Sequence, residues 1–316
     1  EMLLRHTRKM FSEWIPNVPK HKIVIHKSSH YQPHPIWDIK DAEKSLITHI
    51  EPKSLSDKYS YYSMKYIRKT FDFLTGYSQE SMTEKAYLRR IIFLETVAGV
   101  PGMIGGMVRH FKALRTLSRD KGWIHHLLEE AENERMHLYF FLKIRQPGHF
   151  LRWSIIGGQF VFIGYYSLLY LLFPKTAHRF VGYLEEEAVK TYTRLIDDID
   201  SGKLKEWKVS PAPAEAIKYY GLKPDAMMRD MLICIRADEM QHREYNHHFS
   251  KISSSESMKH HDLILIENEN KNDKWRVVQG VYILFKNFVL LFKYALLIRI
   301  FAYLFLGIGD WGLGIG

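Results

Sequence analysis

The chain has 316 residues, 46% of them hydrophobic, which is enough to bury one large core or two smaller ones. Its formal net charge is +10, but the Lys and Arg residues are dispersed and no zinc-finger or RNP-type motif occurs, so nucleic acid is disfavoured as a partner and an anionic membrane surface is not. Cys234 is the only cysteine, which excludes an internal disulfide, and its helical surroundings predict a packed core thiol.

The first 36 residues contain Pro and His without a regular apolar period, which predicts an N-terminal arm over residues 1–36. His26, His30 and His34 are the nearest approach to a second metal cluster in the sequence. Pro33 interrupts the helical spacing that such a cluster would need, so the expected structure is a solvated arm.

Apolar residues with helical spacing predict an all-α protein, and no stretch shows a convincing alternating strand. The predicted helices span residues 37–75 with a break at Pro52, 83–100, 123–144, 153–173, 176–199 and 224–250. Together they form one predicted domain over residues 37–250. A polar loop over residues 251–280 and a hydrophobic tail over residues 281–316 follow.

Two predicted helices carry the same short motif, Glu-x-x-His. One is Glu134 with His137, and the other is Glu239 with His242. Residues three apart share a helix face, so each pair offers a carboxylate and an imidazole to one point. Two such pairs, with one Glu from each of two further helices, form the di-iron or di-manganese site of ferritin-like four-helix bundles. Glu95 is the candidate on the first of those further helices.

The other additional carboxylate comes from a run of three, Glu185, Glu186 and Glu187, of which only one can point straight into a bundle. Tyr192 lies seven residues after Glu185 and therefore on the same face, so Glu185 is favoured as the ligand. Glu186 and Glu187 would then face solvent or substrate. Four carboxylates and two imidazoles favour iron or manganese over calcium or magnesium, and the absence of cysteine from the candidate ligands disfavours structural zinc.

Asn133 and Asp238 directly precede the two ligand glutamates Glu134 and Glu239. Either can orient a ligating histidine by accepting its second N–H. Each is equally compatible with an ordinary polar residue on a helix surface, and the spacing leaves both interpretations open.

Four motifs resemble the iron-binding motifs of the alternative oxidases, the cyanide-insensitive ubiquinol oxidases of mitochondria. They are Leu-Glu-Thr-Val-Ala-Gly-Val-Pro-Gly-Met at 94–103, Asn-Glu-Arg-Met-His-Leu at 133–138, Leu-Glu-Glu-Glu-Ala at 184–188 and Arg-Ala-Asp-Glu-Met-Gln-His-Arg at 236–243. The resemblance covers roughly residues 37–249. It implies a ferritin-like bundle with a di-iron carboxylate centre and additional membrane-contacting helices.

The resemblance also implies a role for each matching residue. Two iron ions per chain would be held by Glu95, Glu134, His137, Glu185, Glu239 and His242, with Tyr192 as the redox-relevant tyrosine. The quinol pocket would be lined by Arg68, Asp72, Arg90, Leu94, Leu184, Glu187 and Thr191. The surrounding hydrogen-bond network would contain Asn133, His178, Tyr219 and Asp238, and the homodimer interface would contain His110, Arg115, Arg135 and Gln159.

The activity that the resemblance implies is oxidation of ubiquinol with reduction of O2 to water, resistant to cyanide and without proton pumping. The alternative is a di-iron hydroxylase of quinone biosynthesis, which shares the six-ligand pattern, and a non-redox alternative is a ferritin-like iron-binding protein. This chain departs from the family in having Tyr219-Tyr220 where many members have Tyr-Trp, and in lacking the N-terminal regulatory cysteines of the plant branch.

Two segments bear on membrane contact. Residues 153–173 carry no formal charge and are long enough to span a bilayer, but the segment lies between two ligand helices and contains Gly and Tyr. A helix lying in one leaflet or packed in a dimer is therefore favoured over a span. This agrees with the monotopic, matrix-facing placement on the mitochondrial inner membrane that the resemblance implies. In the tail, Lys286 and Lys293 share a helix face, which favours an interfacial anchor, with a true span as the alternative.

Overall fold

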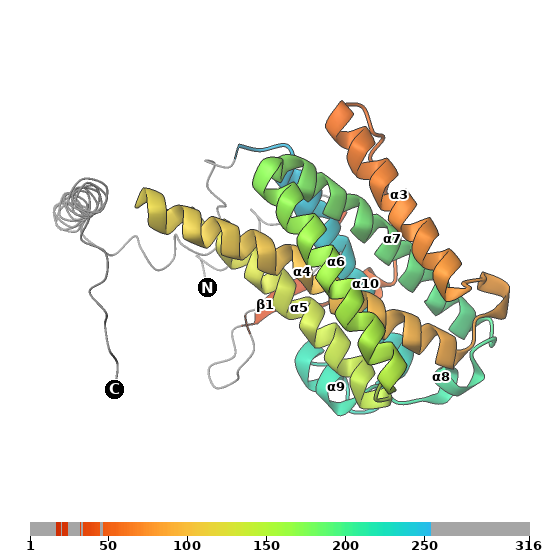
Figure 1. Cartoon of the computed structure of the whole chain (residues 1–316). Helices are drawn as coiled ribbons and strands as arrows, with labels where there is room; N and C mark the ends of the chain where they lie inside the picture. The colour runs from red at the N-terminus through yellow and green to blue at the C-terminus, as the bar shows by residue number, and fades with distance from the viewer. Residues whose placement is uncertain (1–16, 20, 25–31, 33, 45–46, 254–316) are drawn as a thin grey trace, which may run out of the picture. The chain divides into compact units, whose positions relative to one another are not determined.

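The structure is a computed structural model, and it describes residues 17–253 except 20, 25–31, 33 and 45–46. The predicted hydrophobic tail and most of the polar loop before it lie outside the described residues. The elements, in chain order, are β1 His21–Val24, β2 His34–Trp37, α2 Ile39–Ala42, α3 Leu55–Thr75, the 3-10 turn η1 Gln79–Ser81, α4 Glu84–Thr116, α5 Trp123–Ile144, α6 His149–Leu172, α7 Pro174–Asp200, α8 Lys205–Val209, α9 Ala214–Tyr220 and α10 Met228–Phe249 (Figure 1).

Four long helices carry the candidate ligands: α4, α5, α7 and α10. Among the described elements, α7 and α10 make the most extensive contact, and α3 and α6 also pack on α7. All the candidate ligands lie in one compact unit, which contains residues 17–111 and 120–253 of the described chain. The described part of the second unit is Lys112–Arg119. The predicted helical fold is confirmed, and Cys234 is buried as expected.

Local sequence signals explain several helix boundaries. Ser54 and Asp57 form a capping box at the start of α3, and Gly76 ends that helix with a left-handed φ of 62°. Helix α4 extends past the predicted end at residue 100 and runs through Pro101. Gly102 follows Pro101 in α4, and a Cβ built on it would lie 2.4 Å from the carbonyl oxygen of Leu127 in α5. The glycine therefore permits the close approach of α4 and α5.

The N-terminal segment contains a small sheet, which corrects the expectation that the chain is helical throughout. Strands β1 and β2 pair antiparallel, with His21 opposite Trp37. Each strand has only four residues and prolines interrupt the sequence, so no alternating pattern is visible. His34 is buried and stacks on Tyr219 with ring centroids 3.7 Å apart, so the expected solvated arm is wrong at this residue. His26 and His30 lie outside the described residues.

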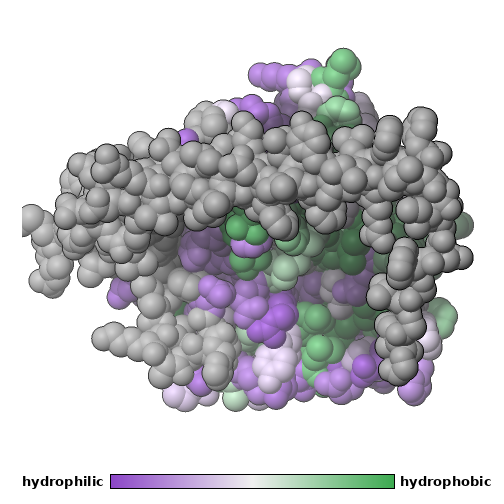
Figure 2. All heavy atoms as spheres, turned by 60° about the vertical axis from the view of Figure 1, so that its left-hand side comes forward, coloured by the Kyte–Doolittle hydropathy of each residue, from purple (hydrophilic) through white to green (hydrophobic). Residues whose placement is uncertain are grey.

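Large apolar side chains are exposed along two outer helices. On α6 they are Phe150, Trp153, Ile156, Phe160, Val161, Ile163, Leu168, Leu171 and Leu172, and on α3 they include Leu55, Tyr62, Tyr66, Phe73 and Leu74. Among the described helices, α4 and α6 are long and apolar enough to span a membrane. In α4, half of the most apolar stretch is buried inside the protein, whereas in α6 only 17% of that stretch is buried. Figure 2 shows a face on which hydrophilic and hydrophobic side chains both reach the surface.

Candidate metal centre

Six side chains from four helices converge in the middle of the bundle. Two groups of potential ligands each lie within 4.8 Å: Glu95, Glu134, His137 and Glu239 form one, and Glu134, Glu185, Glu239 and His242 form the other. All six residues are buried. Glu134 and Glu239 belong to both groups, so they lie where carboxylates can bridge two metal ions.

The Glu-x-x-His spacing places its side chains as predicted. In the first group, Nδ1 of His137 is 3.4 Å from Oε2 of Glu95 and 3.5 Å from Oε2 of Glu134. In the second, Nδ1 of His242 is 2.8 Å from Oε1 of Glu134. Both histidines therefore turn the same ring nitrogen toward the carboxylates, as ligands of a shared centre would.

Several of the candidate donor atoms are buried and not satisfied by hydrogen bonds, as expected of metal ligands. Among the described residues, no contact has hydrogen-bond geometry at Oε2 of Glu95, at either carboxylate oxygen of Glu134, or at Nδ1 of His137 and of His242, although these atoms are close together and buried. Buried polar atoms without partners are rare because desolvating them is unfavourable. Ions of the iron or manganese type would satisfy oxygen and imidazole donors together, so the residues fit a di-metal site.

Burial and mutual charge set the proton affinities of the clustered side chains. Burial raises the pKa of Glu95 to about 8, against the opposing effect of the adjacent His137 imidazole. Burial also raises the pKa of Glu185 well above its usual value, and the charge of Glu239 adds to the rise. Burial would raise the pKa of Glu134 too, but the adjacent imidazoles of His137 and His242 hold it below its usual value. The carboxylates thus differ in protonation, and cations would replace bound protons.

A second group of residues surrounds Asp238. Its Oδ2 accepts hydrogen bonds from Nε2 of His137 at 2.9 Å, the Tyr220 hydroxyl at 2.6 Å and Nδ2 of Asn133 at 3.1 Å. Of the two interpretations that the spacing left open for Asp238, the structure therefore supports the one in which it orients a candidate ligand. Asn133 accepts no N–H from a histidine among the described residues: its Oδ1 has no hydrogen-bond partner, and its Nδ2 donates to Asp238 and Tyr219. Tyr220 contributes its phenol to this network.

Trp37 completes that network, and sequence reasoning missed it. Its indole Nε1 donates to Oδ1 of Asp238 at 2.7 Å, across 201 residues of chain. A lone tryptophan at the end of a short strand carries no local signal of such a contact. The indole is 5% exposed, so the N-terminal hairpin belongs to the core around the metal centre.

Tyr192 lies beside the candidate ligands. Its hydroxyl donates a hydrogen bond to Oε1 of Glu95. Burial, and then the negative charge of Glu95, raise the pKa of the phenol well above its usual value, so it keeps its proton. Its seven-residue spacing from Glu185 places both on the inner face of α7, as predicted.

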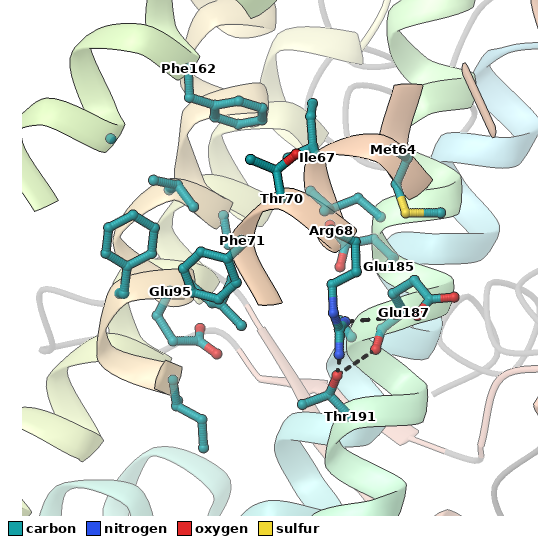
Figure 3. Close-up of a pocket in the computed structure, with 18 of the residues that line it drawn as sticks. Met64, Ile67, Arg68, Thr70, Phe71, Glu95, Phe162, Glu185, Glu187 and Thr191 are labelled. Atoms are coloured by element: carbon teal, nitrogen blue, oxygen red, sulfur yellow. Dashed lines mark hydrogen bonds and ion pairs between the residues drawn. The ribbon is translucent and has the colours of Figure 1, made fainter. Parts of the chain in front are cut away.

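A cavity of about 490 Å³ reaches the cluster from α3, α4, α6 and α7. Figure 3 shows Glu95 and Glu185 among the residues that line it, with dashed lines from Arg68 to Glu187 and Thr191. Of the predicted quinol-pocket residues, Arg68, Leu94, Leu184, Glu187 and Thr191 line it. Asp72 and Arg90 do not. Asp72 pairs with Arg68 at 3.0 Å and with Arg90, so these two residues support Arg68 from outside the cavity.

The other predicted residues have varied surroundings. His178 belongs to a separate network, in which its Nδ1 donates to Asn246 at 3.0 Å and Tyr170 approaches its Nε2 at 3.3 Å.

Glu186 is 2% exposed, which corrects the expectation that it faces solvent or substrate. Of the predicted dimer-interface positions, His110, Arg115 and Arg135 are exposed, whereas the Gln159 amide donates to the carbonyl oxygen of Thr96.

Comparison with known proteins identifies the family. The family model described as "Alternative oxidase" matches residues 37–251. "Alternative oxidase, mitochondrial" of Emericella nidulans is 48% identical over 225 residues, which are 68% of this chain and 64% of that protein. "Alternative oxidase, mitochondrial" of Trypanosoma brucei brucei is 47% identical over 243 residues, 77% of this chain and 72% of that protein. The matched part thus spans about 64% of the first of these relatives. The chain belongs to the alternative oxidase family.

Proposed function

We propose that the protein is a ubiquinol oxidase that reduces O2 to water at a non-haem di-iron centre, in cyanide-resistant respiration without proton pumping. One observation carries this proposal: the cavity and the ligand cluster share Glu95, Glu185 and Glu239. A substrate in the cavity therefore lies directly against the metal centre. Two quinols give up four electrons and four protons, and one O2 takes them up to form two waters.

In this proposal, two iron ions are held by Glu95, Glu134, His137, Glu185, Glu239 and His242. Bound there, the irons supply the positions at which O2 is reduced and the means of passing electrons to it. The protein's own contribution is to hold the ligand side chains in place and to keep bulk water away from them. Asp238 fixes the ring of His137 through Nε2, and the burial of all six ligands excludes bulk water.

The quinol ring would enter the cavity with its hydroxyls toward the polar residues on α3 and α7. Arg68 Nη1 lies 3.4 Å from the Thr191 hydroxyl and 3.7 Å from Oε2 of Glu187, so these three groups can hold the head group. Leu94 and Leu184 supply apolar contact. The Tyr192 hydroxyl, which keeps its proton and donates to Oε1 of the ligand Glu95, would be a proton donor beside the metal centre.

The same proposal places the protein on the matrix face of the mitochondrial inner membrane as a monotopic homodimer. The relatives are named mitochondrial. The exposed apolar side chains of α3 and α6 support contact with lipid, and quinol is itself a lipid-soluble substrate. The proposal assigns the exposed His110, Arg115 and Arg135, together with Gln159, to the homodimer interface.

The test is anaerobic loading of the purified protein with iron, followed by measurement of quinol-dependent O2 uptake with cyanide present. We expect two irons per chain, and two quinols consumed for each O2. Glu185→Ala and His242→Ala should lose both iron and activity, whereas the exposed Glu80→Ala should keep them. Hydroxylated quinone as the product would support the biosynthetic hydroxylase instead, and mineralised iron would support a ferritin-like protein.

A further inference from the structure

Three consecutive glutamates on α7 have three different sets of partners. Glu185 joins the metal cluster. Glu186 is buried against α10 and the segment before α3, and Glu187 pairs with Lys65 at 2.8 Å and Lys190 at 3.0 Å. A helix rotated by one residue, about 100°, would offer a different carboxylate to the metals. Some feature of the fold must therefore set the rotation of α7.

The carboxylate of Glu186 is held by three donors from two other parts of the chain. Its Oε1 accepts from Nε2 of His247 at 3.0 Å and from the backbone N–H of Ile50 at 3.1 Å. Its Oε2 accepts from Nδ1 of His49 at 2.6 Å. The carbonyl oxygen of Ile50 in turn accepts from the Tyr183 hydroxyl at 3.0 Å. Glu186 thus joins α7 to α10 and to the segment around Ile50.

His247 is fixed at both ring nitrogens. Arg179 can only donate, so its Nη1, at 2.9 Å, makes Nδ1 of His247 an acceptor. Nε2 must then carry the proton that is donated to Glu186. Arg179 is itself paired with Asp57 at 2.7 Å. The imidazole therefore has one orientation and one tautomer, and it cannot turn without breaking both contacts.

Gly182 makes room for that ring. It lies four residues before Glu186, on the same face of α7. A Cβ built on Gly182 would lie 2.4 Å from Nδ1 and 2.8 Å from Cγ of His247. Real Cβ atoms do not approach so closely, and the ring is held at both nitrogens. The imidazole thus occupies a notch that only glycine can provide.

We propose that Glu186 is a positioning residue, which together with His247 and Gly182 fixes the rotation of α7 and so directs Glu185, and not its neighbours, to the metal centre. The proposal rests on the di-metal site of the proposed function. It adds that a contact between α7 and α10, made by the side chains of Glu186 and His247, which are not candidate ligands, determines which carboxylate reaches the site. Glu186 acts through Glu185, because the two are neighbours on one rigid helix.

The experiment compares Gly182→Ala, Glu186→Gln and the control Gly164→Ala, since a Cβ on Gly164 of α6 meets nothing within 4 Å. Each variant is loaded anaerobically with ⁵⁷Fe. Iron retention against a chelator, the Mössbauer spectrum and the unfolding temperature of the iron-free protein are then measured. We expect both α7 variants to retain iron about tenfold less well or worse, as for other residues that support metal ligands, and to have an altered spectrum, with Gly164→Ala unchanged.

A double variant tests whether the effect passes through the ring. In a His247→Ala background the notch is empty, so adding Gly182→Ala should weaken iron retention no further. Glu186→Gln changes no volume and carries the test if Gly182→Ala does not fold. Wild-type iron retention and spectrum in a folded Glu186→Gln variant would overturn the proposal, even with a lower unfolding temperature. A wild-type protein that binds two irons but oxidises no quinol would overturn only the proposed activity.

Discussion

The indole of Trp37 and the carboxylate of Asp238 are joined by a 2.7 Å hydrogen bond between the N-terminal hairpin and α10. The same carboxylate receives Nε2 of His137 on its other oxygen. A residue of the small sheet thus acts on a candidate metal ligand through one intervening group. The hairpin is therefore part of the support of the metal centre.

Trp37→Phe tests this relationship. The variant leaves Oδ1 of the buried Asp238 without its donor, which should lower the free energy of unfolding by about 1–3 kcal/mol. Looser orientation of His137 should weaken iron binding by about 10- to 100-fold. Denaturant titration and chelator competition measure the two effects. Trp153→Phe is the matched control because Trp153 is 71% exposed on α6; equal effects in both variants would contradict the role assigned to Trp37.

Tyr192→Phe separates proton or electron donation from metal binding. Only the hydroxyl that bonds to Glu95 is removed, so the iron content should stay at two per chain. Loss of a positioned proton donor typically slows a reaction by 10²–10⁴, and we expect kcat for quinol oxidation to fall by at least about 100-fold. Tyr62→Phe, on the exposed side of α3, should leave kcat unchanged. A Tyr192→Phe enzyme with wild-type kcat would remove the phenol from the mechanism.

The sequence predicts the ligand set because that set depends on local spacing. Glu134 with His137, and Glu185 with Tyr192, share helix faces whatever the rest of the fold does. The supports of the centre do not follow from spacing. Trp37 reaches Asp238 across 201 residues, and Glu186 is buried through contacts with His247 and His49 that only the assembled fold creates.

Iron binding should release protons and strengthen with rising pH. The pKa of Glu95 is raised to about 8 by burial, and that of Glu185 is also raised, so the metal-free protein holds protons that metal ions must displace. Because protons compete with the metal below a raised pKa, the affinity for Fe(II) should increase as pH rises toward about 8. Anaerobic calorimetry in two buffers of different ionisation enthalpy counts the released protons. Affinity independent of pH would show that the carboxylates are already ionised.

Arg68→Met tests the polar end of the cavity. Arg68 contacts Thr191 and Glu187 and is held by Asp72, but it touches no candidate metal ligand in these contacts. The variant should raise KM for quinol by about tenfold, as expected for loss of a hydrogen bond to a charged group, and keep two irons per chain. Lys69→Met, which removes an exposed cation from the same helix, is the control. An unchanged KM would place the quinol head group elsewhere.

The exposed apolar face of α6 should bind lipid. Trp153 and Phe160 are 71% and 81% exposed, and burying a large apolar side chain contributes about 1.5–3 kcal/mol. Replacing both by Asp removes that gain and adds two charges, so binding to vesicles with anionic lipid should fall by at least about 100-fold in a flotation assay. Leu55→Asp together with Tyr62→Asp asks the same of α3. Since neither α6 residue contributes to the ligand cluster, the iron content should be unaffected. Vesicle binding that survives both pairs of changes would locate the lipid contact outside these two helices.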